Sequence, residues 1–364
     1  MVPRRFLNLV MMDMRVGGSY WLSRMKPEEN LFYSSAKEAA AQESQQRRVK
    51  VKLTAESTLE LPPPETRFTS SRALDSTLAF LPFYGLAGSE GSRVVVADSG
   101  GGTLLYDADQ GSTEILPPIN QGEKWFIPIS LCVTNPKQAF RPDALYVINQ
   151  ANSANFKSLV YCNEADVMAW RWLDLPNPPY FSSANKDRTI KSHTLLGDGK
   201  TICFSGSFGT YCYDTDSEEW TQAGTWMLPF EGCSLQVPEL YNLHFGFHEN
   251  NPDNLVALEL SSPLEGASQP KVLHQWRGFC PPHRNEWALM ENSLLYLGNY
   301  RFCIAKWFAI YHGSSYERDS LLDMAAVLTG VEIVNGQKNK DKLQMVMHKT
   351  RTFIFEEENL ETVM

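Results

Sequence analysis

The sequence has no excess of basic residues and no long apolar run. Lys and Arg number 33 against 42 Asp and Glu, and the formal net charge is −9. Nucleic-acid-binding proteins usually carry a basic patch or stripe, so we expect no nucleic-acid partner. Without a run of about 18 apolar residues, we also expect no membrane span. The opening MVPRRFLNLVMMDM lacks a long apolar core and a small-residue cleavage site, so it does not predict a signal peptide.

Cysteine is scarce, and its spacing forms no pattern. The seven cysteines are odd in number and include no Cys-x-x-Cys pair. This usage predicts buried thiols in a reducing compartment, and hence a cytoplasmic or nuclear protein. Cys203 and Cys212 could face each other across a hairpin, where a disulfide is geometrically possible. The compartment argument favours two thiols instead.

Motifs for metal binding and nucleophilic catalysis are also missing. His244 and His248 lie in HFGFH, a predicted strand, where four residues span ~13 Å, too far for one ion. Cys280 and His283 form a pair without the second pair of a four-ligand zinc site. No Gly-x-Ser-x-Gly elbow occurs in a strand–turn–helix context, and no Cys has a nearby His on a plausible common site. We therefore predict no enzyme, and no catalytic residue, cofactor or metal.

Acidic residues are frequent in the predicted turns. They are Asp98, Asp107, Asp166, Asp214 and Asp216. An Asp in a turn commonly bonds the backbone two residues on, so we expect these side chains to be structural. The alternative is an enzyme whose turn carboxylates and His form a site at the mouth of a central channel.

The clearest pattern in the sequence is a four-stranded unit at residues 192–230. Its short β-prone runs are separated by turn signals such as Gly-Asp-Gly at 197–199. In one middle strand, Ile202 and Phe204 share a face, with Cys203 opposite. Such a meander cannot bury both faces by itself, and stacking copies radially would cover them.

The same pattern recurs along the chain. The run GTLLYD at 102–107 mirrors GTYCYD at 209–214, and this match is the strongest sign of repetition. Pro clusters separate some of the units, since Pro cannot donate a ladder hydrogen bond. Further strand-rich segments are predicted at residues 66–119, 129–175, 233–276, 287–310 and 324–355.

These repeats predict an all-β fold, a β-propeller of four-stranded antiparallel blades. We expect six blades, with five or seven as alternatives, and a sandwich or barrel as the competing architecture. Terminal strands in a ring commonly pair, so residues 4–25 should lie beside the C-terminal strands. The whole chain, 1–364, would be one domain. Within it, we expect residues 34–65 to be a polar low-complexity insertion or linker, and 356–364 a frayed acidic tail.

Tryptophan is abundant in the predicted strands. Large rings bury much area, so we expect these residues to pack between blades. A subset at the surface could instead anchor a partner or bind sugar. The residues are Trp170, Trp172, Trp220, Trp226, Trp276 and Trp307.

Several motifs occur in one fixed order over about residues 4–312. They are RRFLNLV, LFY before an Ala-rich stretch, LPPPETRF, GGTLLYDAD, LYVINQ, WLDLPNPPY, ICFSGSFGTYCYDTDSEEWTQAGTWMLPF, VPEL and YRFCIAKWF. In this order they resemble a plant family, expanded in grasses, that is known as domain of unknown function 1668. The resemblance implies a plant protein with a kelch-like propeller. It implies no catalytic residues, because the family has no established activity.

A repeat scaffold without a catalytic constellation favours one function. We expect a non-catalytic protein-interaction scaffold whose unknown partner binds on a loop face or in the central channel. Two alternatives of other classes stay open. They are the channel-mouth enzyme and a carbohydrate-binding module.

Overall fold

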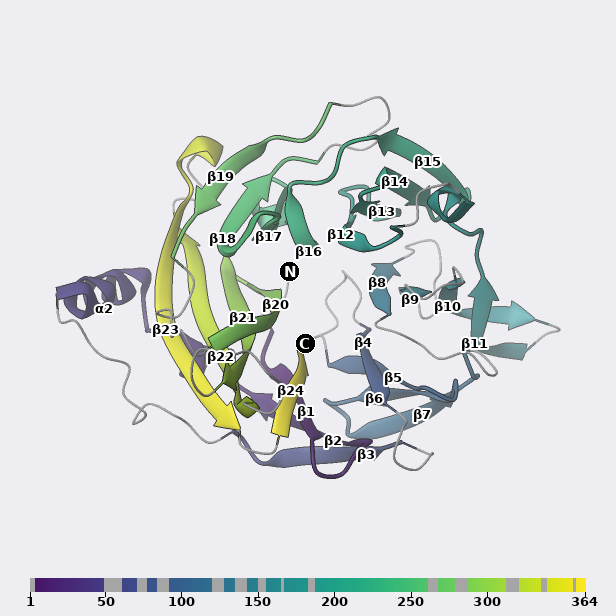
Figure 1. Ribbon diagram of the computed structural model, residues 1–364, viewed down its shortest axis with the longest axis horizontal. Coiled ribbons are helices and arrows are strands. Elements are labelled where there is room, and N and C mark those ends of the chain that lie inside the picture. Colours follow the sequence, from purple (N-terminus) through teal and green to yellow (C-terminus); the bar gives the residue numbers. More distant parts are fainter. Residues whose placement is uncertain are drawn as a thin grey trace.

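Short antiparallel sheets stand around a common centre, as in a β-propeller (Figure 1). The predicted all-β fold of four-stranded antiparallel sheets is confirmed. Among the residues placed here, no helix is both long and apolar enough to cross a membrane. The computed structural model describes residues 4–48, 61–70, 77–83, 92–119, 128–134, 143–149, 155–164, 167–182, 187–260, 268–278, 287–311, 321–334, 339–355 and 358–364.

Three sheets each hold four strands that follow one another along the chain. The first contains β4 (Leu78–Pro82), β5 (Arg93–Asp98), β6 (Thr103–Asp107) and β7 (Ser112–Leu116). The second contains β8 (Ile129–Thr134), β9 (Asp143–Asn149), β10 (Asn155–Glu164) and β11 (Val167–Asp174). The third contains β20 (Trp287–Gly298), β21 (Arg301–Tyr311), β22 (Leu321–Val334) and β23 (Gln344–Phe355).

An eight-stranded sheet joins two such meanders through their first strands. Strands β12 and β16 run parallel, and His193 is the register partner of Cys233. The predicted unit at 192–230 is the half made of β12 to β15. The strands are β12 (Ile190–Leu195), β13 (Thr201–Gly206), β14 (Gly209–Asp214), β15 (Glu219–Gly224), β16 (Phe230–Val237), β17 (Leu243–His248), β18 (Asn251–Leu258) and β19 (Val272–Trp276).

The remaining sheet brings the two ends of the chain together, in the order β24-β1-β2-β3. Strand β1 pairs antiparallel with β24, from Leu9 opposite Val363 to Asp13 opposite Glu358. The expected position of residues 4–25 beside the C-terminal strands is therefore confirmed. The strands are β1 (Leu7–Asp13), β2 (Ser19–Met25), β3 (Pro64–Thr69) and β24 (Glu358–Val363).

The expectation of a frayed acidic tail at 356–364 is wrong. Residues 358–363 form β24, and Leu360 and Val363 are 3% and 4% exposed. Leu360 and Val363 fill the core beside β1, on either side of a register shift in the pairing, and pairing with β1 satisfies the backbone. No sheet among the described strands closes on itself, so the number of blades and the closing of the ring stay predictions.

Among the described residues, the two α-helices lie in the connection between β2 and β3. They are α1 (Pro27–Leu31) and α2 (Ala36–Arg48), and short 3₁₀ turns occur at Pro179–Ser182, Pro238–Leu240 and Lys340–Lys342. Part of the predicted insertion at 34–65 is thus the helix α2, and its last two residues open β3. Residues 49–60 of the insertion lie outside the described part of the chain.

The hydrophobic core lies between neighbouring sheets. One cluster joins Leu105 of β6 to Trp170 of β11, and the next joins Val133 of β8 to Phe204 of β13. Ion pairs also link adjacent sheets. Lys306 of β21, whose side chain is 1% exposed, donates to Asp253 of β18 at 2.8 Å. Each sheet thus buries both faces against its neighbours.

The structure joins Cys203 and Cys212 in a disulfide, which corrects the expectation of two thiols. The two residues are direct register partners on β13 and β14, with their Cα atoms 4.2 Å apart. Close Cα atoms are typical of non-hydrogen-bonded antiparallel pairs, where side chains approach each other most nearly. The pairing of the two residues across the hairpin therefore predicted their state better than the expected reducing compartment did. The bond lies in the apolar cluster between the halves of the eight-stranded sheet.

Candidate functional site

The turn carboxylates bind the backbone of their own turns. Asp107 Oδ1 accepts hydrogen bonds from the amides of Asp109 and Gln110, and Asp214 Oδ1 accepts equivalent bonds two and three residues on. Asp98 Oδ1 accepts from Gly100 and Gly102. The predicted structural role of these three carboxylates is confirmed.

The other two acidic candidates have different outcomes. Asp216 lies 3.4 Å from the Lys200 ammonium, which also pairs with Asp214 at 3.0 Å. Asp166 lies outside the described residues. The sequence pattern predicted turns for all five Asp, and the structure does not gather the four described ones into one site.

The histidines of HFGFH do not meet at a metal. Both lie on strand β17, as predicted. His244 is fully buried, and its Nδ1 lies 3.1 Å from Thr194 Oγ1 of β12. His248 Nδ1 instead accepts from the Asn250 amide in the following turn. No group of three or more His, Cys, Asp or Glu among the placed residues is arranged to hold a metal ion, while Cys280 and His283 fall outside those residues.

One His–Cys juxtaposition was missed. We predicted that no Cys has a nearby His on a plausible common site, yet His193 and Cys233 are register partners on β12 and β16. Desolvation lowers the pKa of His193 to about 4 and raises that of Cys233 to about 12. Both groups are therefore neutral near pH 7, and a reactive thiolate–imidazolium pair does not form.

Two carboxylates on inner strands were also missed. Glu291 of β20 and Glu361 of β24 lie on edge strands, each the strand of its sheet nearest the common centre around which the sheets stand (Figure 1). Glu291 is accessible to solvent, but desolvation by surrounding protein raises its pKa. Desolvation also raises the pKa of Glu361, and the negative charge of Glu291 raises it further. No local pattern indicated this pair, because 70 residues separate its members.

The tryptophans pack between or within sheets, as predicted. Trp172 donates its indole N–H to the carbonyl of Pro117 at 3.0 Å, and Trp220 donates to that of Pro176 at 2.8 Å. Each of these residues lies on the fourth strand of one sheet and binds the Pro that follows the fourth strand of the sheet before it. The remaining four contact Phe83 (Trp170), the backbone at Gly224 (Trp226), Phe245 (Trp276) and the Leu360 carbonyl (Trp307).

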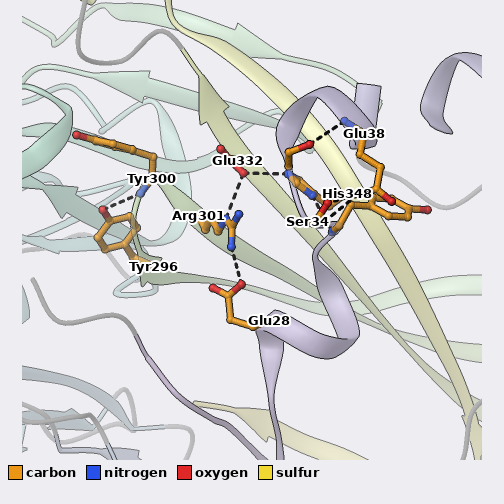
Figure 2. A network of polar contacts seen from close by, with 10 residues as sticks. Glu28, Ser34, Glu38, Tyr296, Tyr300, Arg301, Glu332 and His348 are labelled. Carbon is orange, nitrogen blue, oxygen red and sulfur yellow. Dashed lines mark hydrogen bonds and ion pairs between the residues drawn. The ribbon is translucent and has the colours of Figure 1, made fainter. Parts of the chain in front are cut away.

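The most extensive polar network described here lies where residues 26–38, here called the arm, cross onto a neighbouring sheet. The arm follows β2, yet α1 and α2 pack on β22 and β23. Leu31 is fully buried and Phe32 is 3% exposed. Figure 2 shows the arm seated against this sheet, with polar side chains of both meeting between them.

A turn before β21 and a bulge in β22 position the residues that the sheet contributes to this network. Asn299 and Tyr300 both have positive φ, as in a two-residue type I′ turn, so β21 begins at Arg301. Arg301 is then the register partner of Glu332 on β22. A bulge between Thr329 and Val331 sets Gly330 opposite the β23 residues that follow Met347, including His348.

Charges are arranged in a chain across this junction. The Arg301 guanidinium donates to Glu332 at 3.2 Å and to Glu28 of the arm at 2.5 Å (Figure 2). His348 Nε2 lies 3.1 Å from the same Glu332 oxygen. The His348 imidazole and the Arg301 guanidinium hold the pKa of Glu332 below its usual range, although burial opposes them. Glu332 is thus a carboxylate at every ordinary pH.

The other nitrogen of His348 binds the arm. Nδ1 accepts the backbone N–H of Tyr33 at 3.2 Å, so the proton of the neutral ring lies on Nε2, the nitrogen 3.1 Å from Glu332. The ring also packs against Phe32 and Tyr33, with centroids 5.0 and 6.2 Å away. The side chain has no exposed surface. His348 therefore contacts both the backbone and the rings of the arm.

Comparison with known proteins gives a family and no activity. No curated protein matches the chain. Similar solved structures include a protein of unknown function from Bacteroides thetaiotaomicron (15% identity, TM-score 0.32). The match covers 53% of this chain and 43% of that protein. They also include the Cps50 (Swd1) β-propeller domain of Myceliophteria thermophila (11%, 0.41, covering 92% of this chain and 91% of that one) and a putative TolB from Agrobacterium tumefaciens (8%, 0.31, covering 97% and 98%). These TM-scores all lie below 0.5, so the likenesses indicate no function here.

The family match is longer than the sequence motifs indicated. The motifs covered residues 4–312, whereas the family model matches residues 4–354 and so includes β22 and nearly all of β23, which hold Glu332 and His348. The chain belongs to the family described as Protein of unknown function (DUF1668).

Proposed function

We propose that this chain is a non-catalytic scaffold that binds a protein partner. One observation carries the proposal. The groups that acid–base or nucleophilic chemistry would need are engaged in building the sheets, since Asp98, Asp107 and Asp214 cap turns. Desolvation keeps His193 and Cys233 neutral. Sheets arranged around a common centre, with loops at their ends, suit partner binding.

The test is capture followed by reconstitution. The purified chain, coupled through an added C-terminal tag, is incubated with native plant extract, and bound proteins are identified by mass spectrometry. A recovered protein is then expressed alone and titrated against the chain. The scaffold function predicts saturable binding with a defined stoichiometry. Failure to recover any protein that binds again in purified form counts against it.

The proposal also specifies the kind of organism and the cellular compartment. We propose a kelch-like propeller of a plant, acting in the cytoplasm or nucleus, and the motif order of residues 4–312 supports the plant assignment. A fluorescent fusion in plant cells tests the location. Signal confined to the secretory pathway would contradict it, and would also suit the Cys203–Cys212 disulfide better.

An enzyme is the second candidate, favoured by the coupled carboxylates Glu291 and Glu361. A carboxyl group whose pKa is raised can act as a general acid near neutral pH. The candidate predicts turnover of an ester, glycoside or phosphate substrate that the double variant Glu291→Gln/Glu361→Gln loses. Glu358→Gln, on the same strand as Glu361, is the matched control. Equal turnover by the double variant and the control would exclude this pair as the site.

A further inference from the structure

The arm crosses from its own sheet to the next one. It follows β2 and leads toward β3, and both strands belong to the sheet β24-β1-β2-β3. Its contacts, however, are with β21, β22 and β23 of the neighbouring sheet. No strand pairing holds the arm there. The arm is therefore seated as a separate peptide would be, by side chains of the sheet.

The sheet binds the backbone of the arm at successive positions. Lys349 Nζ donates to the carbonyl of Glu29 at 3.2 Å, and Arg351 Nε donates to that of Asn30 at 2.8 Å. The next carbonyl, of Leu31, lies so close to Gly330 that a Cβ there would overlap it. His348 Nδ1 then accepts the N–H of Tyr33. Contacts to backbone atoms do not depend on the identity of the bound residues, which is typical of peptide recognition.

Three side chains of the arm add specificity. The Glu28 carboxylate pairs with Arg301, three positions before Leu31. Leu31 and Phe32 are buried in the interface. The Phe32 ring packs on His348 and lies 4.8 Å beneath the Arg301 guanidinium carbon. The occupant is thus an acidic residue, a spacer of two, and an apolar–aromatic pair.

We propose that this surface of β21–β23 is a peptide-binding site, held in this structure by the chain's own arm. A partner segment with an acidic residue three positions before Leu-Phe competes with the arm for it. The proposal rests on the scaffold function and names the chemistry of its partner. The arm is then an autoinhibitory occupant that must leave before the partner binds.

The test uses a labelled peptide of residues 26–38 and the full chain carrying Leu31→Asp with Phe32→Asp. The two charges expel the arm and leave the sheet untouched. We expect the peptide to bind this variant at least about tenfold more tightly than the wild-type chain, whose site is occupied, which corresponds to about 1.4 kcal/mol. A peptide with the same two Asp substitutions is the matched control. Adding Gly330→Ala to the variant should abolish binding, because the new Cβ overlaps the Leu31 carbonyl.

A folded variant that does not bind the peptide, or that binds it equally well with Gly330→Ala, overturns the site. If the variant does not fold, excess peptide is added to the wild-type chain. Hydrogen exchange at the chain's own residues 27–33 should then accelerate, and unchanged exchange at saturating peptide overturns the site.

These outcomes separate the site from the scaffold function. A partner recovered from extract that binds the Gly330→Ala chain as well as the wild type upholds the scaffold function and overturns this site. Peptide binding with no recoverable partner upholds the site and counts against the scaffold function.

Discussion

Trp220 of β15 donates its indole N–H to the backbone carbonyl of Pro176, 2.8 Å away in the connection that leaves β11. Trp172 makes the same bond to Pro117 one sheet earlier. The bond fixes the outer strand of one sheet to the chain that leaves the sheet before it. Successive sheets are therefore linked at their rims as well as through their apolar faces.

Replacing Trp220 with Phe should destabilise the chain by about 1 kcal/mol, since it removes one hydrogen bond and leaves the Pro176 carbonyl without it. Urea unfolding measures the change. Trp276→Phe is the matched control, because among the described residues the Trp276 indole stacks on Phe245 and makes no hydrogen bond. Equal losses for the two variants would show that ring size, not the bond to Pro176, determines the effect.

The buried pair of Lys306 and Asp253 predicts an asymmetric result. Asp253→Asn removes the carboxylate that neutralises an ammonium group in a nearly closed site, and should cost about 3 kcal/mol of unfolding free energy. Lys306→Met keeps an apolar stem in place of the charge and leaves Asp253, which is 28% exposed, able to hydrate. Lys306→Met should therefore lower the unfolding free energy by less than Asp253→Asn does. A larger loss for Lys306→Met would contradict this explanation.

The disulfide predicts sensitivity to reductant. It closes a short loop, with nine residues of sequence separation, so its removal should lower stability by about 2–3 kcal/mol in the chain-entropy model. Thermal unfolding is measured with and without dithiothreitol for the wild type and for Cys203→Ala/Cys212→Ala. Reductant should lower the Tm of the wild type only. A wild-type Tm that is the same with and without the reductant would indicate two thiols, as the sequence had led us to expect.

The buried His244 predicts loss of stability in mild acid. Burial lowers its pKa from 6.5 to about 4 in the folded chain, so between these values the unfolded chain binds a proton that the folded chain does not. Stability present above pH 6.5 is therefore lost as the pH falls toward 4, by up to about 3 kcal/mol. His244→Asn does not titrate and should flatten this part of the curve of unfolding free energy against pH. The same curve for both proteins would refute the assignment.

Most strands could be predicted from the sequence because their patterns are local. Alternating apolar residues and turn signals located β2 at its observed bounds, and the repeated Tyr-Asp identified β6 and β14 as equivalent third strands. Two strands were missed. Strand β3 starts at the last residue of a Pro triplet, and β24 is rich in Glu, so neither resembles an isolated strand. Each is stabilised by a neighbour, β2 or β1, that a local pattern does not reveal.

The arm's site was beyond prediction for a similar reason. Arg301 and Glu28 are 273 residues apart in the sequence, and Tyr33 and His348 are 315 apart. The composition of 34–65 indicated a linker because α2 has no apolar stripe, and the apolar anchors, Leu31 and Phe32, lie just before that range. The signal that could have found them is the short run LFY, which is apolar and precedes a helix-forming stretch.

The parallel bonding between β12 and β16 has a mechanical consequence. Backbone hydrogen bonds run without interruption from β15 to β19, so these eight strands form one cooperative unit, whereas other neighbours meet mainly through side chains. Slow opening motions of the ring will therefore begin elsewhere, and the amides of Thr194 and Ser234 will exchange with solvent only when both halves unfold together.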